Sequence, residues 1–277
     1  MGTCSYCGKK AGFLKKAHKE CEKKYQEGRF KYIELVRTGI VDNKDFEELE
    51  KEIKDLKETA FINDIHIPEL NVRGFDKALL DFLEDGVLSV EEEERICGFM
   101  DHFNLGQSDL DKHGSYMKMS MAIVLRELTE GRIPEMEIKV DGQLPFLFQK
   151  SESLIWLFNQ VEFYEQRTRT EFRGGSQGVS VRVAKGVYYR AGAFKGKPVK
   201  YEEMKHIGNG ILALTTKHIY FSYPNKSFKI PFNKIIALEP YENGIGVQKD
   251  GVTAKPQVFK NLDGWFAHNA ISNLSQL

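Results

Sequence analysis

Long apolar runs are missing from this sequence, and no stretch approaches the length of about 20 residues that a helix needs to cross a bilayer. The first residues are polar, and Cys4 and Cys7 stand where the apolar core of a secretory signal would have to lie. Cysteine is also scarce: three of the four residues lie among the first 21 and Cys97 stands alone, which is unlike a secreted disulfide framework. We therefore expect a cytoplasmic protein.

Recognisable catalytic motifs are absent as well. The seven histidines are scattered, and the sequence contains neither a His-Glu-x-x-His motif nor a Gly-x-Ser-x-Gly nucleophile turn. The glycine-rich residues 173–178 lack the Gly-Lys-Ser/Thr ending of a phosphate-binding loop, so we interpret them as a linker. These absences predict a protein that is not an enzyme.

Net charge is zero, because 40 lysines and arginines balance 40 aspartates and glutamates. The charge is nevertheless segregated: residues 1–31 carry +6, residues 61–101 carry −8 and residues 173–277 carry +9. Two basic ends around an acidic middle fit either docking of unlike surfaces within the molecule or binding of anionic partners. The charge pattern leaves both alternatives open.

Three of the four cysteines belong to one candidate metal-binding motif. Cys4 and Cys7 are separated by two residues, and His18 and Cys21 follow with the same spacing. Three cysteines and one histidine form a common closed ligand set for tetrahedral Zn²⁺. The surrounding segment has few large apolar side chains, so a metal would have to supply its folding free energy. We predict a structural zinc site, because protein ligands would fill all four positions.

The alternative is a chance cluster of free thiols beside a surface histidine. The ligand spacing resembles that of a small treble-clef-like zinc finger, which would cover residues 1–31. Cys97 lies in a predicted amphipathic helix, where a buried cysteine usually acts as a small apolar side chain.

Helical spacing of apolar residues continues from residue 17 to about residue 132. We predict a helical connector at 32–68 and an all-helical module at 69–134, with Ser89 and Glu92 as a capping box. The turn before Ser89 imitates a calcium loop, but Leu83 replaces an oxygen ligand, which favours a plain joint between helices. The turn and its flanking helices resemble the helical module of tellurite-resistance B-type proteins, and that resemblance implies no catalytic chemistry.

Beyond Pro134 the pattern changes to short β-rich runs separated by glycine, proline and asparagine. We expect a linker and helix at 135–175 and a separate domain at 176–277, whose first two strands are residues 179–183 and 187–194. The fold class predicted is α+β multidomain: a small zinc finger, an all-helical middle and a C-terminal antiparallel β-barrel.

The last segment, residues 263–274, regains helical spacing. Asp263 is a plausible N-cap for this helix. We expect the helix to close the barrel, with Trp265 and Phe266 plugging its open end as core residues.

The second half of the chain also carries a motif. A glycine, a leucine, a threonine, an isoleucine and a phenylalanine occur at fixed spacing before a basic strand; they are Gly210, Leu212, Thr215, Ile219 and Phe221. This pattern resembles the hairpin of bacterial pleckstrin-homology-like (PH-like) and GRAM-like domains. The resemblance implies a bent, seven-stranded sheet capped by a C-terminal helix. It also implies recognition of lipid headgroups or protein segments, without catalysis.

Taken together, these features predict an adaptor or sensor that binds a protein partner through the PH-like domain. Binding to anionic membranes is an alternative, with Lys195, Lys197 and Lys200 as candidate ligands. These lysines form no compact phosphate clamp in the sequence, which favours the protein partner. Nucleic-acid binding through the lysine-rich residues 1–31 is a third alternative.

Overall fold

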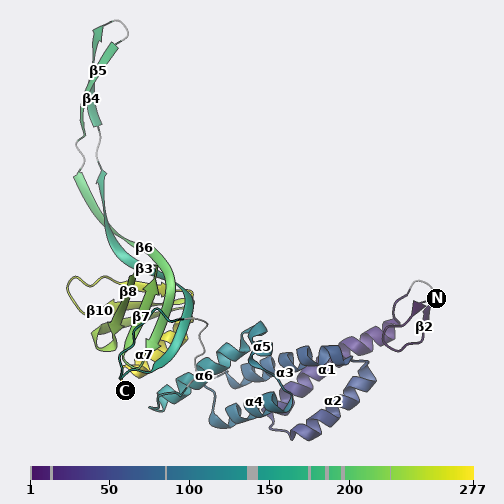
Figure 1. The fold of residues 1–277 in the computed structure, drawn as a ribbon. Helices are drawn as coiled ribbons and strands as arrows, with labels where there is room; N and C mark the ends of the chain where they lie inside the picture. Colours follow the sequence, from purple (N-terminus) through teal and green to yellow (C-terminus); the bar gives the residue numbers. More distant parts are fainter. Residues whose placement is uncertain are drawn as a thin grey trace. The chain divides into compact units, whose positions relative to one another are not determined.

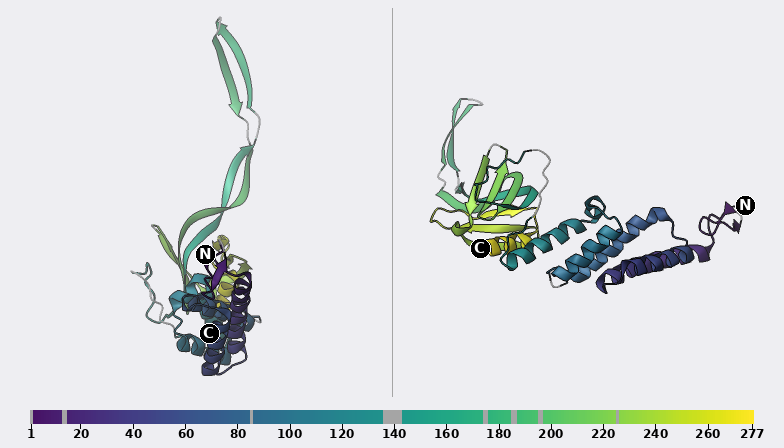
Figure 2. Two further views of the ribbon diagram at one scale, coloured as in Figure 1. Left: turned by 90° about the vertical axis from the view of Figure 1, so that its right-hand side faces the viewer. Right: turned by 60° about the horizontal axis from the view of Figure 1, so that its bottom comes forward.

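A computed structural model describes residues 2–12, 15–84, 86–135, 143–173, 176–184, 187–194, 197–224 and 226–277, with the backbone alone described for residues 170–200. The chain forms two compact units, Met1–Arg132 and Ile133–Leu277, and the elements of each can be followed in Figures 1 and 2. Within the described ranges, none of the helices combines the length and the apolar composition that a bilayer span requires.

The N-terminal unit is a small hairpin followed by a bundle of helices. Its elements are β1 (Gly2–Thr3), β2 (Lys10–Gly12), α1 (Lys19–Val41), α2 (Phe46–Ala60), α3 (Ile67–Phe82), α4 (Val90–His102), α5 (Gln107–Leu110) and α6 (Ser115–Thr129), with short 3₁₀ turns at Asp64–His66 and Asp111–His113.

Local capping defines where several of these helices begin. The Asp45 side chain accepts a hydrogen bond from the backbone N–H of Glu48 at the start of α2. At the start of α4, the Ser89 hydroxyl accepts from the Glu92 N–H and the Glu92 carboxylate accepts from the Ser89 N–H. The predicted capping box is therefore confirmed. Both caps satisfy N–H groups that have no partner inside the helix.

One hydrophobic core joins helices from both sides of the boundary predicted between the connector at 32–68 and the module at 69–134. Buried residues of α1 and α2, among them Tyr32, Val36 and Leu49, belong to the same cluster as Phe75 of α3 and Phe99 of α4. Residues 32–68 are thus integral to the bundle and do not form a separate linker. Their apolar stripes are complete only when all four helices pack together.

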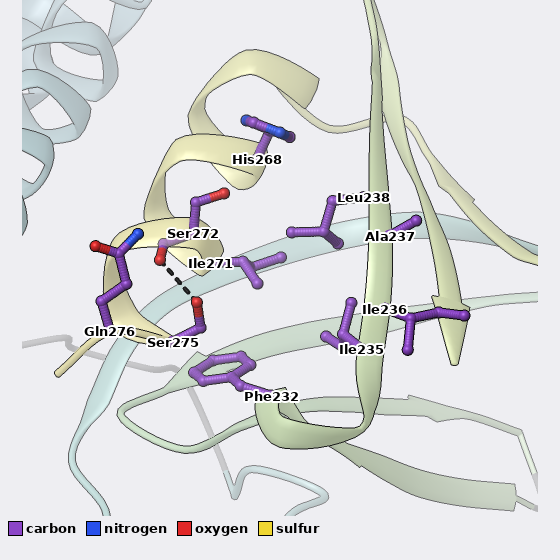
Figure 3. A pocket seen from close by; sticks show the side chains of 10 residues that line it. All are labelled: Phe232, Ile235, Ile236, Ala237, Leu238, His268, Ile271, Ser272, Ser275 and Gln276. Atoms are coloured by element: carbon purple, nitrogen blue, oxygen red, sulfur yellow. Dashed lines mark hydrogen bonds between the residues drawn. The ribbon is translucent and has the colours of Figure 1, made fainter. Parts of the chain in front are cut away.

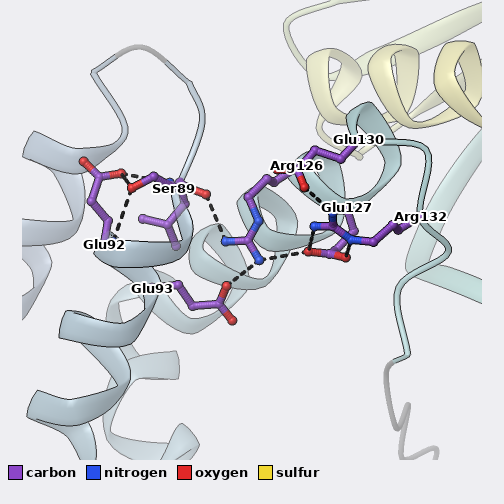
Figure 4. A network of polar contacts seen from close by, with 8 residues as sticks. Ser89, Glu92, Glu93, Arg126, Glu127, Glu130 and Arg132 are labelled. Carbon is purple, nitrogen blue, oxygen red and sulfur yellow. Dashed lines mark hydrogen bonds and ion pairs between the residues drawn. The ribbon is translucent and has the colours of Figure 1, made fainter.

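A network of charged residues connects α6 to α4 (Figure 4). The buried guanidinium of Arg126 donates to the backbone carbonyl of Leu88 at 3.2 Å and lies 2.6 Å from the Glu93 carboxylate. Glu127 accepts from Arg126 at 3.0 Å and from Arg132 through two bonds of 2.6 and 2.8 Å. The hydrogen bonds from Arg132, followed by that from Arg126, lower the pKa of Glu127 to about 2.

The C-terminal unit is a curled antiparallel sheet of seven strands closed by one helix. Its elements are β3 (Leu154–Arg173), β4 (Ser176–Ala184), β5 (Val187–Phe194), β6 (Lys197–Thr215), β7 (His218–Tyr223), β8 (Lys226–Pro231), β9 (Ile235–Tyr241), β10 (Gly244–Lys249), β11 (Gln257–Lys260) and α7 (Gly264–Leu274). The strand order in the sheet is β8-β7-β6-β3-β11-β10-β9. A cluster of aromatic rings, including Phe163, Phe221 and Phe259, fills its interior.

The expectation of a linker and helix at 135–175 is wrong for most of that range, because β3 occupies Leu154–Arg173 at the centre of the sheet. Irregular pairing between Phe158 and Val161, with a positive φ of 57° at Gln160, interrupts the alternation that marks a strand in sequence. The outer half of β3 is polar as well. Both features make the strand difficult to recognise from the sequence.

The two strands expected to open the barrel also lie elsewhere. Among the described strands, β4 and β5 pair only with each other, outside the seven-stranded sheet. Of the residues 173–178 that were expected to be a linker into the first strand, residue 173 ends β3, residues 176–178 begin β4, and residues 174 and 175 lie outside the described residues.

The closing helix α7 begins as predicted, with the Asp263 side chain accepting from the Phe266 N–H at 2.8 Å. Phe266 is buried and contacts the ring of Trp156 on β3. Trp265, however, is 55% exposed, so the expectation that it plugs the barrel is wrong. Adjacent helical residues point about 100° apart, and the inward stripe includes Phe266 but not Trp265.

A first prediction concerns the close contact of α1 and α3. A Cβ atom at Gly74 would lie 2.5 Å from the Cβ of Val36. Alanine usually stabilises a helix relative to glycine by about 0.5–1 kcal/mol, but overpacking here should make Gly74→Ala destabilising by about 1–3 kcal/mol. Urea unfolding followed by circular dichroism measures the change. Adding Val36→Ala should cost less in the Gly74→Ala background than in the native protein; a more stable Gly74→Ala protein would contradict this packing argument.

A second prediction concerns acid stability. The folded-state pKa of Glu127 is depressed to about 2. Its ion pairs therefore stabilise the fold fully above the ordinary glutamate pKa, and this stabilisation is lost as the pH falls from there toward about 2. Glu127→Gln should therefore lower the melting temperature at about pH 6, and the difference from the native protein should shrink at about pH 3. Glu91→Gln, at an exposed position, is the control. An undiminished difference in acid would exclude this role for Glu127.

Candidate functional site

The first cysteine pair lies on the turn between β1 and β2. The backbone N–H of Cys4 donates to the Lys9 carbonyl at 2.7 Å, and the Gly8 N–H donates to the Cys4 carbonyl at 3.0 Å. Gly8 adopts a positive φ of 70°, a conformation that side chains with a Cβ rarely take. The tight turn presents both Cys4 and Cys7 toward the same point.

The second ligand pair lies where α1 begins. His18 is the N-cap residue and Cys21 lies in the first turn, so the start of one helix positions both side chains. Together the hairpin and the helix bring all four predicted ligands into one cluster. One ligand atom from each of Cys4, Cys7, His18 and Cys21 lies within 4.8 Å of the other three.

The distances within the cluster suit a tetrahedral metal ion. With metal–sulfur bonds of about 2.3 Å and metal–nitrogen bonds of about 2.0 Å, ligand sulfur and nitrogen atoms should be about 3.5 Å apart. The Nδ1 atom of His18 lies 3.4 Å from the Cys7 sulfur and 3.7 Å from the Cys21 sulfur. Four protein ligands leave no position for a reactive water, so the cluster fits a structural ion.

An outer contact orients the histidine. The other ring nitrogen of His18, Nε2, lies 3.0 Å from the backbone carbonyl of Lys10, which can only accept a hydrogen bond. Nε2 must therefore carry the proton, and the Nδ1 lone pair is left for the metal. Such a contact between a ligand histidine and a carbonyl is usual in metal sites.

The thiol groups differ in their electrostatic environment. Burial raises the pKa of Cys4, but hydrogen bonds from the backbone of Cys7, His18 and Tyr6 outweigh it and lower the value to about 6. Burial and the neighbouring thiols of Cys7 and Cys4 raise the pKa of Cys21 to about 11. A divalent cation would relieve the repulsion between these thiolates, and its binding would release protons.

Aromatic contacts attach the cluster to the helical bundle. The ring of Tyr6, between the two cysteines of the first pair, packs 4.9 Å from the ring of Tyr25 on α1. Tyr25 belongs to the hydrophobic core and also contacts His66. The turn that carries the first cysteine pair is therefore packed on the bundle through Tyr6.

The three lysines considered as lipid ligands do not form a described site. Lys195 lies outside the described residues, and Lys197 and Lys200 lie in β6 where the backbone alone is described.

A groove between β9 and α7 was not predicted from the sequence (Figure 3). It has a volume of about 290 Å³. Ile235 and Leu238 of β9 and Ile271 of α7 point into the space between strand and helix, whereas Ile236 and Ala237 lie on the other side of the strand. His268 and Ser275 lie along its helix side. The run of four apolar residues at 235–238 was the available sequence signal, but its partner helix is distant in sequence.

A buried polar cluster attaches the segment before β3 to the sheet. The Glu152 carboxylate has no exposed surface; it lies 2.9 Å from the His218 ring and accepts from the Thr215 hydroxyl at 2.8 Å. Phe146 packs nearby on Tyr220. We assign this cluster a structural role, because its hydrogen bond and ion pair join Glu152 to β6 and β7.

A third prediction tests the metal centre. Purified protein should contain about one metal ion per chain, and Cys21→Ser should lose it because three ligands hold the ion much less tightly. Elemental analysis measures the content, and chelation should lower the melting temperature of the native protein but not that of Cys21→Ser. Cys97→Ser, outside the cluster, is the matched control and should keep its metal. Carefully reduced native protein without metal would refute the site.

Comparisons with known protein families and with curated proteins find no match for this chain. The functional assignment therefore rests on the metal centre and the groove.

Proposed function

We propose that the protein is a non-enzymatic adaptor whose C-terminal unit binds an extended segment of a partner protein between β9 and α7. The observation that carries this proposal is that the groove, whose lining includes the apolar side chains of Ile235, Leu238 and Ile271, lies beside β9, the strand at one edge of the sheet. No strand in the described part of the chain pairs with the outer edge of β9. Such an edge can accept a further strand from another molecule.

The position of a proline identifies which backbone groups are available. Pro240 of β9 lies opposite Ile245 of β10. Because proline has no N–H, the hydrogen bonds of this ladder come from the alternate residues, Glu239 and Tyr241. The backbone N–H and C=O of Leu238, two residues before Pro240, therefore face the free edge. An incoming strand could exchange both hydrogen bonds with Leu238.

An irregularity in β9 shapes the floor of the groove. Gln248 pairs with Ala237 and Lys249 with Ile235, so Ile236 is an extra residue in the ladder. This bulge allows Ile235 and Leu238 to face α7 together (Figure 3). Alternate side chains of a bound segment could bury apolar surface there, while main-chain bonds fix its direction.

The assignment to a PH-like domain remains part of this proposal. The order of seven antiparallel strands followed by a closing helix supports it, as does the motif from Gly210 to Phe221. A recognition domain of this kind needs no catalytic residues, which agrees with an adaptor.

We propose zinc as the ion in the N-terminal unit. Three thiols and one imidazole form a soft ligand set with tetrahedral spacing, and zinc is the common ion for such closed sites. Its role would be to hold the short hairpin on α1, so that this unit can present a stable surface to a second macromolecule.

A fourth prediction tests the groove with peptides selected from a random display library against the full-length protein. The selected peptides should be extended and should alternate apolar residues. Ser272→Trp fills the groove from α7 without altering a core residue, and it should weaken binding by about tenfold or more, since it blocks the apolar floor. Fluorescence anisotropy of a labelled peptide measures this.

Asn273→Trp is the matched control, because Asn273 follows on the same helix but does not line the groove. Equal affinity of the native and Ser272→Trp proteins would show that the peptides bind elsewhere. Failure to enrich any peptide would count against segment binding altogether.

A further inference from the structure

A two-stranded ribbon extends the pairing of β3 and β6 beyond the seven-stranded sheet (Figure 1). We define the arm as its outer part, residues 170–173, 176–184, 187–194 and 197–200. By connectivity, β4 follows the end of β3 and β5 precedes the start of β6. The arm thus consists of strands that lie outside the sheet core and contribute nothing to the groove beside α7.

The inner part of the ribbon has balanced charges. Arg167 lies opposite Glu203, and Glu165 lies opposite Lys205. Arg169 forms an ion pair with Glu203 at 3.8 Å. Cross-strand pairs of opposite charge stabilise a ribbon.

The arm lacks this balance. Its described strands contain five basic residues, Arg173, Arg182, Arg190, Lys197 and Lys200, and one acidic residue, Glu171. The register places Arg173 directly opposite Lys197, whereas Glu171 lies opposite Val199. Arg182 and Arg190 lie opposite Tyr188 and Ser180. None of the five basic residues has an acidic cross-strand partner.

The register of the arm places no basic residue directly opposite an acidic one. A two-stranded hairpin is marginal in water without further packing, and the one pair of like charges, Arg173 opposite Lys197, destabilises it further. A polyanion would remove this repulsion and add favourable contacts along the strands. The charge pattern therefore favours an extended anionic partner.

We propose that the arm binds the sugar-phosphate backbone of duplex DNA, independently of base sequence. A two-stranded ribbon fits the major groove, which is about 12 Å wide. The nine residues of β4 span roughly 30 Å at about 3.3 Å per residue, close to one turn of the duplex. Three of the five basic residues are arginines, whose planar donors suit phosphate. The pair Gly178 and Gly192 leaves backbone without side chains where a duplex could approach closely.

This inference goes beyond the adaptor function and does not depend on it. It differs from nucleic-acid binding by residues 1–31, because it uses strands of the other unit. If the protein is an adaptor, the groove would bind the partner protein and the arm would bind the second macromolecule, the DNA.

The fifth prediction tests the arm on the full-length protein, with fluorescent duplexes of about 30 base pairs, long enough to provide several phosphate contacts. Two duplexes of unrelated sequence should bind with equal affinity. The logarithm of affinity should fall linearly with the logarithm of salt concentration between about 50 and 200 mM. Replacing Arg173, Arg182 and Arg190 together by Gln should weaken binding at least about tenfold and reduce the salt slope by about 3.

Two further variants make the result decisive. Replacing residues 176–194 by an Asn-Gly turn removes β4 and β5 but leaves the seven-stranded sheet, and it should bind no better than the triple variant. Replacing Lys9, Lys15 and Lys19 by Gln removes the same number of charges beside the metal centre and should leave the affinity and the slope nearly unchanged. Circular dichroism establishes that each variant is folded.

Several outcomes would overturn the proposal. Failure of the full-length native protein to bind either duplex at low salt would exclude the proposal. Binding that depends on Lys9, Lys15 and Lys19 would place the contact on the N-terminal unit. Loss of binding to phosphatidylserine-containing vesicles in the triple variant, without duplex binding by the native protein, would identify a membrane surface as the partner.

Discussion

Backbone pairing of β3 is the interaction on which the C-terminal unit depends. The strand lies between β6 and β11 and is the one described connection between the two halves of the sheet, β8-β7-β6 and β11-β10-β9. Its inner residues contribute Trp156 and Phe163 to the core. Its outer residues pair with β6 to form the ribbon. The groove beside β9 and the arm are thus supported by one strand, although they lie at different places in the unit.

The N-terminal unit uses two kinds of stabilisation. Its helices share a continuous apolar core, in which Tyr32 and Phe75 are fully buried. The short hairpin before α1 cannot bury comparable surface, and its four clustered ligands offer a metal in place of a core. Tyr6 connects the two systems, because it lies between two ligands and packs on Tyr25. Loss of the metal would therefore loosen the contact between the hairpin and α1 before it affected the distant helices.

The features that sequence reasoning predicted are local ones. The four metal ligands occur in two closely spaced pairs, and the caps at Ser89 and Asp263 depend on residues three positions apart. Short β-rich runs bounded by glycine, proline and asparagine likewise predicted strands in the second half of the chain. The missed features depend on distant pairing or broken periodicity. β3 was hidden by the irregularity at Gln160 and by its polar outer half. The groove arises only when α7 packs beside β9, and no local pattern specifies that contact.

The free edge of β9 offers few regularly spaced backbone groups for hydrogen bonds with another strand. Pro240 removes one donor, and the bulge at Ile236 interrupts the regular spacing of the remaining groups. Both devices are known to limit uncontrolled pairing between sheet edges. They also restrict how many main-chain bonds any bound segment can form. Since differences in affinity among related complexes are expressed mainly in dissociation rates, a segment held on β9 would leave quickly. Exchange among competing segments, rather than long residence of one, is the behaviour that this edge favours.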